Sequence, residues 1–139
     1  MKFHTIIAVA CTVLAISIPG PVSAHDSEGQ TITQNFEAAI PNIRGKSLIA
    51  LEVDYAPGAA SAPHTHAKSA FIYAYVISGA IESKVNDGET RIYHAGESWS
   101  ELPGAVHLIS RNASKIEPAK LLAVFILDTG DKPLTTPNK

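Results

Sequence analysis

Short apolar segments separated by polar turns run through most of the chain, and they predict an all-β protein. Residues 47–55 (SLIALEVDY) are β-branched and apolar, as a strand is, and residues 80–85 alternate between apolar and polar positions. Residues 70–77 and 119–127 are apolar on both faces, as buried central strands are. Weaker strands are expected at residues 31–36, 89–93, 97–101 and 106–110. No segment keeps an apolar period of 3.6 residues, so no helix is expected.

Turn residues separate these segments at intervals of about 8–12 residues, which is typical of β-sandwiches and barrels. Asn86-Asp87-Gly88 predicts a tight hairpin with a residue at positive φ, and Ser78-Gly79 and Pro103-Gly104 mark further turns. The polar tail from Thr129 onward contains two prolines and is expected to be frayed. The predicted fold is one small β-barrel domain over residues 25–139.

The first 24 residues have the pattern of a secretory signal peptide. Lys2 supplies the positive charge, residues 5–17 form an apolar run, and Val22-Ser23-Ala24 places small residues before a cleavage site. Cleavage after Ala24 would export the mature chain, so a secreted or periplasmic protein is expected. The alternative is a retained membrane anchor, but the run is shorter than the roughly 20 apolar residues of a spanning helix. In an exported protein, Asn112-Ala113-Ser114 is a formal N-glycosylation sequence.

The predicted mature chain contains no cysteine, because Cys11 is the only one and lies in the signal segment. Disulfides and thiolate ligands are therefore excluded, and a bound metal would need imidazole, carboxylate or water ligands. Without Lys2, ten basic side chains stand against thirteen acidic ones. This balance argues against a nucleic-acid partner, and no run of like charge suggests binding to a membrane surface.

Three histidines are the candidate metal ligands. His64 and His66 are separated by one residue, so an extended segment places both side chains on one face, whereas a helix would turn them about 200° apart. Pro63 favours extended backbone just before them, and His107 follows later in the chain. The alternative is three separate histidines in the core or at the surface. Imidazoles that share one ion suit Fe(II), Mn(II), Ni(II), Zn(II) or Cu(II).

The spacing of glycine, histidine and proline resembles the two short motifs of the cupin superfamily. The first motif is matched by Gly58, His64-Thr65-His66 and Gly79. The second motif is matched by Gly96, Pro103-Gly104, His107 and Asn112. The matched region covers residues 58–112, about half of the predicted mature chain. The resemblance implies a small jelly-roll barrel, also called a double-stranded β-helix, that binds a metal through the three histidines.

Two departures from the cupin motifs affect the expected site. Ile72 stands where the first motif has a glutamate, and residues 67–76 contain no carboxylate or amide. In the second motif the proline is shifted by one place and Asn112 comes one residue late. The fourth ligand that cupin enzymes commonly take from the first motif is therefore missing. Its absence favours an open, water-occupied coordination position, which catalytic sites keep.

Glu101 ends a predicted strand just before the turn that leads to His107, so its carboxylate is a candidate fourth ligand or general base. A buried carboxylate is costly unless it is paired or bound to a metal. The alternative is an exposed glutamate at the rim of the barrel. Tyr73 and Tyr75 share one face of a predicted strand, and they either line the same cavity as ligand-binding residues or pack in the core.

The resemblance implies the fold more firmly than the reaction, because cupin barrels serve enzymes, sugar-binding proteins and storage proteins. One hypothesis is a metal-dependent oxidoreductase, similar to small quercetin-dioxygenase-like cupins, that acts on a small organic molecule with Glu101 as base. The other is a non-catalytic cupin that binds a small ligand or a metal. By analogy with cupins that pair through N-terminal strands, a homodimer is expected, with residues 31–36 as the candidate contact.

Overall fold

The computed structural model describes residues 27–138, which form ten β-strands and no helix. The strands are β1 (Gln30–Ala39), β2 (Lys46–Tyr55), β3 (His64–His66), β4 (Phe71–Ser78), β5 (Ala80–Val85), β6 (Arg91–His94), β7 (Ser98–Glu101), β8 (Val106–Asn112), β9 (Ala119–Asp128) and β10 (Thr135–Pro137). In the part of the chain that the structure describes, no helix is long and apolar enough to cross a membrane. The predicted signal peptide lies outside the described residues.

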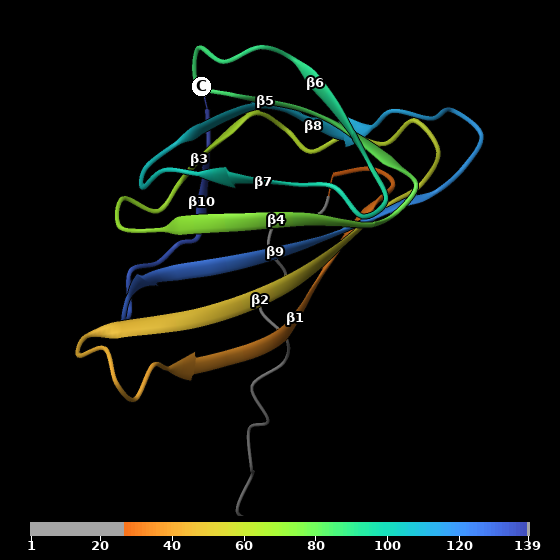
Figure 1. Cartoon of the computed structure of the whole chain (residues 1–139). Helices are drawn as coiled ribbons and strands as arrows, with labels where there is room; N and C mark the ends of the chain where they lie inside the picture. Colours follow the sequence, from red (N-terminus) through yellow and green to blue (C-terminus); the bar gives the residue numbers. More distant parts are fainter. Residues whose placement is uncertain (1–26, 139) are drawn as a thin grey trace, which may run out of the picture.

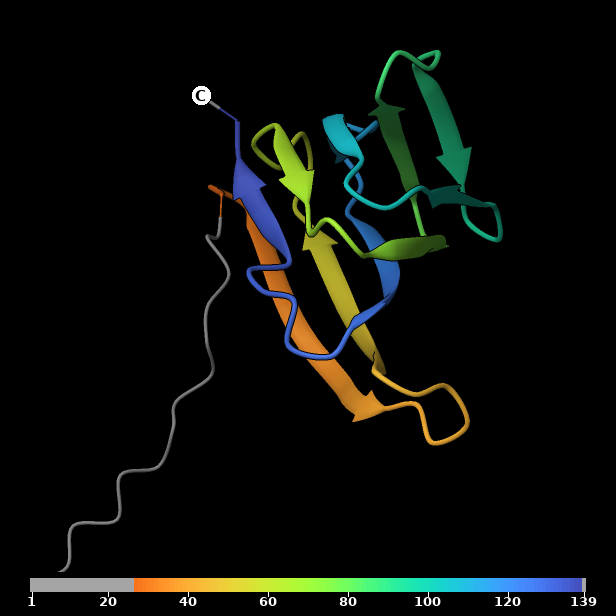
Figure 2. The ribbon, with the colours of Figure 1, turned by 90° about the vertical axis from the view of Figure 1, so that its left-hand side faces the viewer.

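The strands form two five-stranded antiparallel sheets (Figures 1 and 2). The strand order is β1-β2-β9-β4-β7 in one sheet and β10-β3-β8-β5-β6 in the other. Figure 1 shows β1, β2, β9 and β4 side by side in one layer, with β5 and β8 above them. Most neighbouring strands are distant in the sequence, so the sheets are held together by long-range pairing. The predicted all-β jelly-roll barrel is confirmed.

The core lies between the sheets and follows the alternation of the strands. On β2, every second residue from Ser47 to Tyr55 is buried and the residues between them are half-buried. The buried apolar residues form two clusters, one containing Ile72 and Phe125 and the other Val76 and Leu121. The inward side chains of the two sheets pack against each other to form the core. Most of these side chains are apolar, and a smaller number are polar.

A bulge in β8 determines which of its side chains face the interior. On β5, Lys84 pairs with Ile109 and the next residue, Val85, pairs with His107, so two residues of β5 lie opposite three residues of β8. An extra residue shifts the alternation of a strand by one. His107 and Ser110 are therefore both buried, although residues three positions apart on a regular strand face opposite sides.

Two predicted turns have the backbone expected of them. Asn86 has a positive φ of 50°, which confirms the tight hairpin between β5 and β6. Gly79, between β4 and β5, has a φ of +72°, and a Cβ atom built on it would lie 2.6 Å from the carbonyl oxygen of Pro118. Both the left-handed backbone and the close approach of the chain before β9 therefore require glycine at this position.

The C-terminal tail is ordered, so the prediction of a frayed end is wrong. Thr135 pairs with His66 and Pro137 pairs with His64, which makes β10 the edge strand beside β3. Leu134 packs against the core cluster of Ile72. A proline is tolerated on an edge strand because its missing N–H can face away from the sheet. Tertiary pairing thus overrides the polar and proline-rich composition of this segment.

Candidate metal centre

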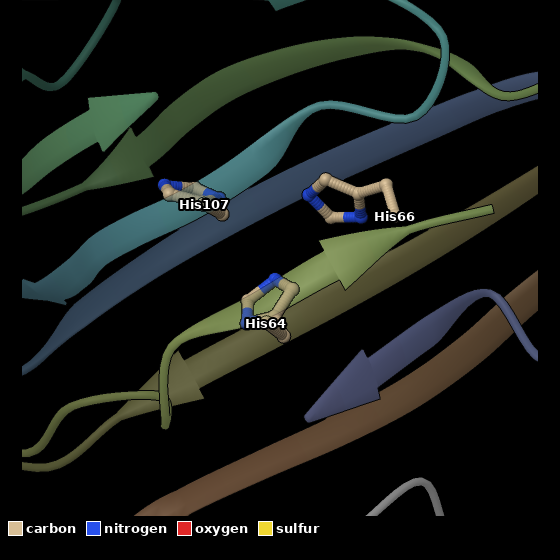
Figure 3. A group of neighbouring side chains, drawn as sticks. All are labelled: His64, His66 and His107. Carbon is tan, nitrogen blue, oxygen red and sulfur yellow. The ribbon is translucent and has the colours of Figure 1, made fainter. Parts of the chain in front are cut away.

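Strands β3 and β8 bring the three histidines together between the sheets. His64 pairs directly with His107 across the β3–β8 ladder, and His66 lies two residues further along β3. One nitrogen from each ring lies within 4.8 Å of the other two, and Figure 3 shows the three rings close together on these strands. The convergence predicted from the His-x-His spacing is confirmed.

Hydrogen bonds orient the rings of His64 and His107, whereas the ring of His66 has none among the described residues. Nδ1 of His64 lies 2.7 Å from the carbonyl oxygen of Ala62 and must donate to it, which leaves Nε2 with a free lone pair. Nε2 of His107 is hydrogen bonded to Oγ of Ser83 at 2.9 Å. Both ring nitrogens of His66 are buried and have no hydrogen-bond partner among the described residues. The His66 ring is therefore free to bind a further group.

Glu101 lies between His66 and His107 and is 3% exposed. Its Oε2 is 3.0 Å from Nε2 of His66, and its Oε1 is 3.4 Å from Nδ1 of His107. The indole N–H of Trp99 donates to Oε1 at 3.0 Å. The contact with His66 lacks hydrogen-bond geometry, so Oε2 has no hydrogen-bond partner among the described residues. The alternative of an exposed rim glutamate is therefore wrong.

The register of β4 and β7 explains why a carboxylate is present here. Glu101 pairs directly with Ile72 across this ladder, and Ile72 occupies the position where the cupin motif has a glutamate. Directly opposite residues of antiparallel strands have Cβ atoms about 4.5–5.5 Å apart. Strand β7 thus supplies the carboxylate of Glu101 directly opposite Ile72, the position where the cupin motif has its glutamate.

The buried environment sets the charges of these groups. Burial lowers the pKa of His107 to about 4 and also lowers the pKa of His64. Burial alone would raise the pKa of Glu101, but its contacts with His66 and His107 outweigh burial and lower that pKa. At neutral pH His64 and His107 are therefore neutral and Glu101 is anionic. These are the protonation states in which imidazole and carboxylate bind a metal.

The histidines line a cavity of about 160 Å³ between the two sheets. Its wall is largely apolar, with Leu51 and Val53 from β2 and Leu121 and Phe125 from β9. Glu101 lines the same cavity. A mostly apolar cavity with a few convergent polar groups is the usual form of a small-molecule site.

The two tyrosines predicted to line this cavity lie on the other face of β4. Ile72 and Ala74 point to the interior and are each 1% exposed, so Tyr73 and Tyr75 point outward. Tyr73 is 43% exposed, and neither tyrosine lines the cavity. Both the ligand-binding role and packing between the sheets are therefore wrong for these residues. Because β4 is apolar on both faces, its sequence does not indicate which face is inside.

The residues of the centre fit a divalent transition-metal ion. The ring nitrogens of His66 and Oε2 of Glu101 are buried polar atoms without hydrogen-bond partners among residues 27–138. Such atoms are costly unless a further group binds them. Three imidazoles with a carboxylate beside them are donors for Fe, Mn, Ni, Zn or Cu. His64, His66 and His107 would hold the ion, with Glu101 next to it.

Sequence reasoning missed two residues that support the centre. Trp99 fixes the Glu101 carboxylate, and Ser83 fixes the ring of His107. The spacing of Trp99 and Glu101 by two residues on one strand was a usable signal, because such residues share a face. The role of Ser83 depends on the pairing of β5 with β8, which no local pattern reveals.

Comparisons with known proteins agree with this fold. The family model of the Cupin domain (Cupin_2) matches residues 51–125. Germin-like protein subfamily 2 member 2 of Arabidopsis thaliana is 29% identical over 112 residues, which cover 78% of this chain and 50% of the relative. The chain thus spans about half the length of the curated relatives it matches.

Solved structures share this fold. KdgF from Halomonas sp. aligns with a TM-score of 0.58 and 23% identity over 76% of this chain and 86% of that one. A recombinant oxalate oxidase in complex with glycolate aligns with a TM-score of 0.59 and 22% identity over 78% of this chain and 55% of that one. The family model covers more than half of the sequence, and the jelly-roll sheets agree with it. We conclude that this protein belongs to the cupin family.

Proposed function

We propose that this protein is a metal-dependent enzyme that acts on a small organic molecule. The observation that carries the proposal is the group of three histidine nitrogens within 4.8 Å of one another, on the wall of a cavity. A purely structural metal site is closed around its ion, whereas a catalytic site keeps a position open to substrate. Access from the cavity therefore favours a catalytic role.

Glu101 is the proposed acid–base group. Its carboxylate is anionic and buried, and Trp99 holds it beside His66 and His107. In this position it can accept a proton from a substrate hydroxyl or enol and later return it. A bound ion would supply Lewis-acid or redox chemistry at a substrate oxygen. The apolar wall excludes water and so strengthens the interactions of the charged groups.

For the reaction class we propose a dioxygenase-type oxidation. In such a reaction both atoms of O2 enter the organic product, so the substrate supplies the electrons and no separate reductant is needed. The histidine-rich donor set supports this class, because it suits redox-active Fe, Mn, Ni or Cu. An oxalate oxidase among the proteins of similar fold provides an analogy for oxidation on this barrel.

The test compares metal content with turnover in two glutamate variants. Glu101→Gln removes the carboxylate charge but keeps the shape of the side chain, and Glu89→Gln makes the same change at an exposed position. We expect elemental analysis to find one ion per chain in both variants. Oxygen uptake with a short diketone or a catechol should be lost in Glu101→Gln and unchanged in Glu89→Gln. Equal turnover in the two variants would exclude Glu101 as the acid–base group.

The second candidate function is a non-catalytic cupin that binds a small ligand or stores a metal. The observation that favours it is Ile72 at the position of the motif glutamate, together with the absence of a carboxylate from the histidine group itself among the described residues. Full metal occupancy without oxygen uptake on any tested substrate would support this function.

We also propose that the mature chain is exported and forms a homodimer. The N-terminal pattern supports export, and β1 supports pairing because it is an edge strand with mostly exposed side chains. N-terminal sequencing of protein from the periplasm or medium should begin at His25. Light scattering should give twice the mass of one chain. A proline in β1, at a position whose N–H faces the free edge of the sheet, should reduce the measured mass to that of one chain.

A further inference from the structure

A second polar cluster lines the cavity apart from the histidines. The phenol oxygen of Tyr55 lies 2.6 Å from Oγ of Ser61 and 2.9 Å from Oγ of Ser110. The amide of Gln30 donates to Oγ of Ser61 at 2.7 Å. All four residues line the same cavity as His64, His66 and His107. We call Gln30, Tyr55, Ser61 and Ser110 the hydroxyl cluster.

The hydroxyl cluster has more protons to donate than it uses. Three hydroxyl groups carry three protons, but only two oxygen–oxygen hydrogen bonds join them. The Gln30 amide carries two protons and gives one to Ser61. Within the described part of the chain, one hydroxyl proton and one amide proton therefore remain without an acceptor. A ligand that offers an acceptor oxygen would complement this excess.

The bulge in β8 places the hydroxyl cluster within reach of the histidines. His107 and Ser110 both face the cavity and are three residues apart, which is about 10 Å at full extension. The remaining wall of the same cavity is largely apolar and includes Val53 and Leu121. A ligand with polar ends and an apolar middle would match this pattern.

The size and charge of the cavity restrict the ligand further. Its volume of about 160 Å³ is close to the 150 Å³ of an engineered apolar cavity that binds benzene. One ring or a short chain therefore fits, and a two-ring compound does not. Among residues 27–138, no lysine or arginine lines the cavity, so this part of the chain gives the hydroxyl cluster no cation for a carboxylate. A neutral carbonyl or ether oxygen suits it better.

We propose that the cavity binds a single-ring or short-chain compound with two oxygen-containing ends. One end, such as a carboxylate or enol, lies at the histidine centre, and this part rests on the proposed metal-binding function. The other end is a neutral acceptor oxygen that takes a proton from the hydroxyl cluster. Tyr55, Ser61 and Ser110 are thus specificity-determining residues.

The test measures binding of three probes to the zinc-loaded protein by calorimetry. The probes are 4-oxopentanoate, pentanoate, which lacks the ketone, and 4-phenylbenzoate, which has two rings. One extra hydrogen bond should make 4-oxopentanoate bind about three- to tenfold tighter than pentanoate. The two-ring acid should not bind. Equal affinity for the two short acids, or binding of the two-ring acid, would overturn the proposal.

A matched pair of triple variants locates the effect. Tyr55→Phe/Ser61→Ala/Ser110→Ala removes the three hydroxyls of the cluster, and Tyr73→Phe/Ser98→Ala/Ser100→Ala makes the same changes at outward positions of β4 and β7. The preference for the ketone should vanish in the first variant and persist in the second. Persistence in both variants would contradict the proposal.

Two further measurements separate the possible failures. The infrared stretch of the ketone bound to wild-type protein should fall relative to an apolar solvent, and an unshifted band overturns the proposal even if the triple variant does not fold. Zinc content is measured first by elemental analysis. A chain that binds zinc without a ketone preference refutes only the hydroxyl cluster, whereas a chain that binds no zinc refutes the proposed metal function and the metal-bound end of the ligand.

Discussion

Replacement of Gly79 by alanine tests whether the close approach of the β4–β5 turn to β9 limits the stability of the barrel. The new Cβ atom would lie 2.6 Å from the carbonyl oxygen of Pro118 and 2.9 Å from Cα of Ala119. Both contacts are with backbone atoms, so rotation of a side chain cannot relieve them. Gly45 is the matched control, because its φ of +74° is close to the +72° of Gly79 and a Cβ atom there has no neighbour within 4 Å.

The difference between the two variants isolates the cost of the contact. Left-handed backbone costs about 1–2 kcal/mol for a residue with a Cβ atom, and both variants share this term. Overpacking adds about 1–3 kcal/mol in Gly79→Ala only. We therefore expect the free energy of unfolding to fall by about 1–2 kcal/mol in Gly45→Ala and by about 2–5 kcal/mol in Gly79→Ala.

Urea denaturation of the metal-free protein, followed by circular dichroism, measures both values. A total stability of about 5–15 kcal/mol leaves both variants folded in most of this range. The same loss in the two variants, within about 0.5 kcal/mol, would refute the steric reasoning. It would mean that the turn moves away from β9 without cost.

Three further predictions concern the centre and its surroundings. Burial lowers the pKa of His107 to about 4, so the unfolded chain binds a proton at this residue more readily than the folded chain does. Acidification from pH 7 to pH 5 should therefore lower the free energy of unfolding of the metal-free protein by about 2 kcal/mol. Denaturation at both pH values should show a smaller loss in His107→Gln; an equal loss contradicts the assignment. Asn112 is buried and its side chain makes three hydrogen bonds, so Asn112→Ala should cost about 2–4 kcal/mol in thermal unfolding, and mass spectrometry should find no glycan there. Deletion of residues 134–139 removes β10 from β3 and should weaken zinc binding several-fold in calorimetry, whereas unchanged affinity would show that β3 is held by β8 alone.

The sequence predicted the strands well where one face is polar. The alternation of residues 80–85 identifies the strand, and the structure buries Ile81 and Ser83 while Glu82 and Lys84 remain nearer solvent. The His-x-His spacing identified a shared face for His64 and His66 by the same reasoning. Local alternation is therefore sufficient for elements and for pairs on one strand.

Other features depend on contacts between distant strands. The phase of β4 was ambiguous because both faces are apolar, and so Tyr73 was assigned to the wrong side. The pairing of Ile72 with Glu101 and the bulge that turns Ser110 inward arise only when strands pair. The hydrogen bonds of the hydroxyl cluster join residues up to 55 positions apart in the sequence. Such long-range register is set by tertiary packing, which single-segment patterns do not contain.

The position of Trp99 gives the protein a built-in optical reporter. It is the only tryptophan in the chain, its indole N–H is bonded to Glu101, and its ring lies 6.4 Å from that of His107. The tryptophan fluorescence of the protein therefore originates beside the histidines. Paramagnetic ions such as Cu(II) or Ni(II) should quench the emission on binding, whereas closed-shell Zn(II) should leave it bright. Occupancy and exchange of the ion can thus be followed in real time without a label.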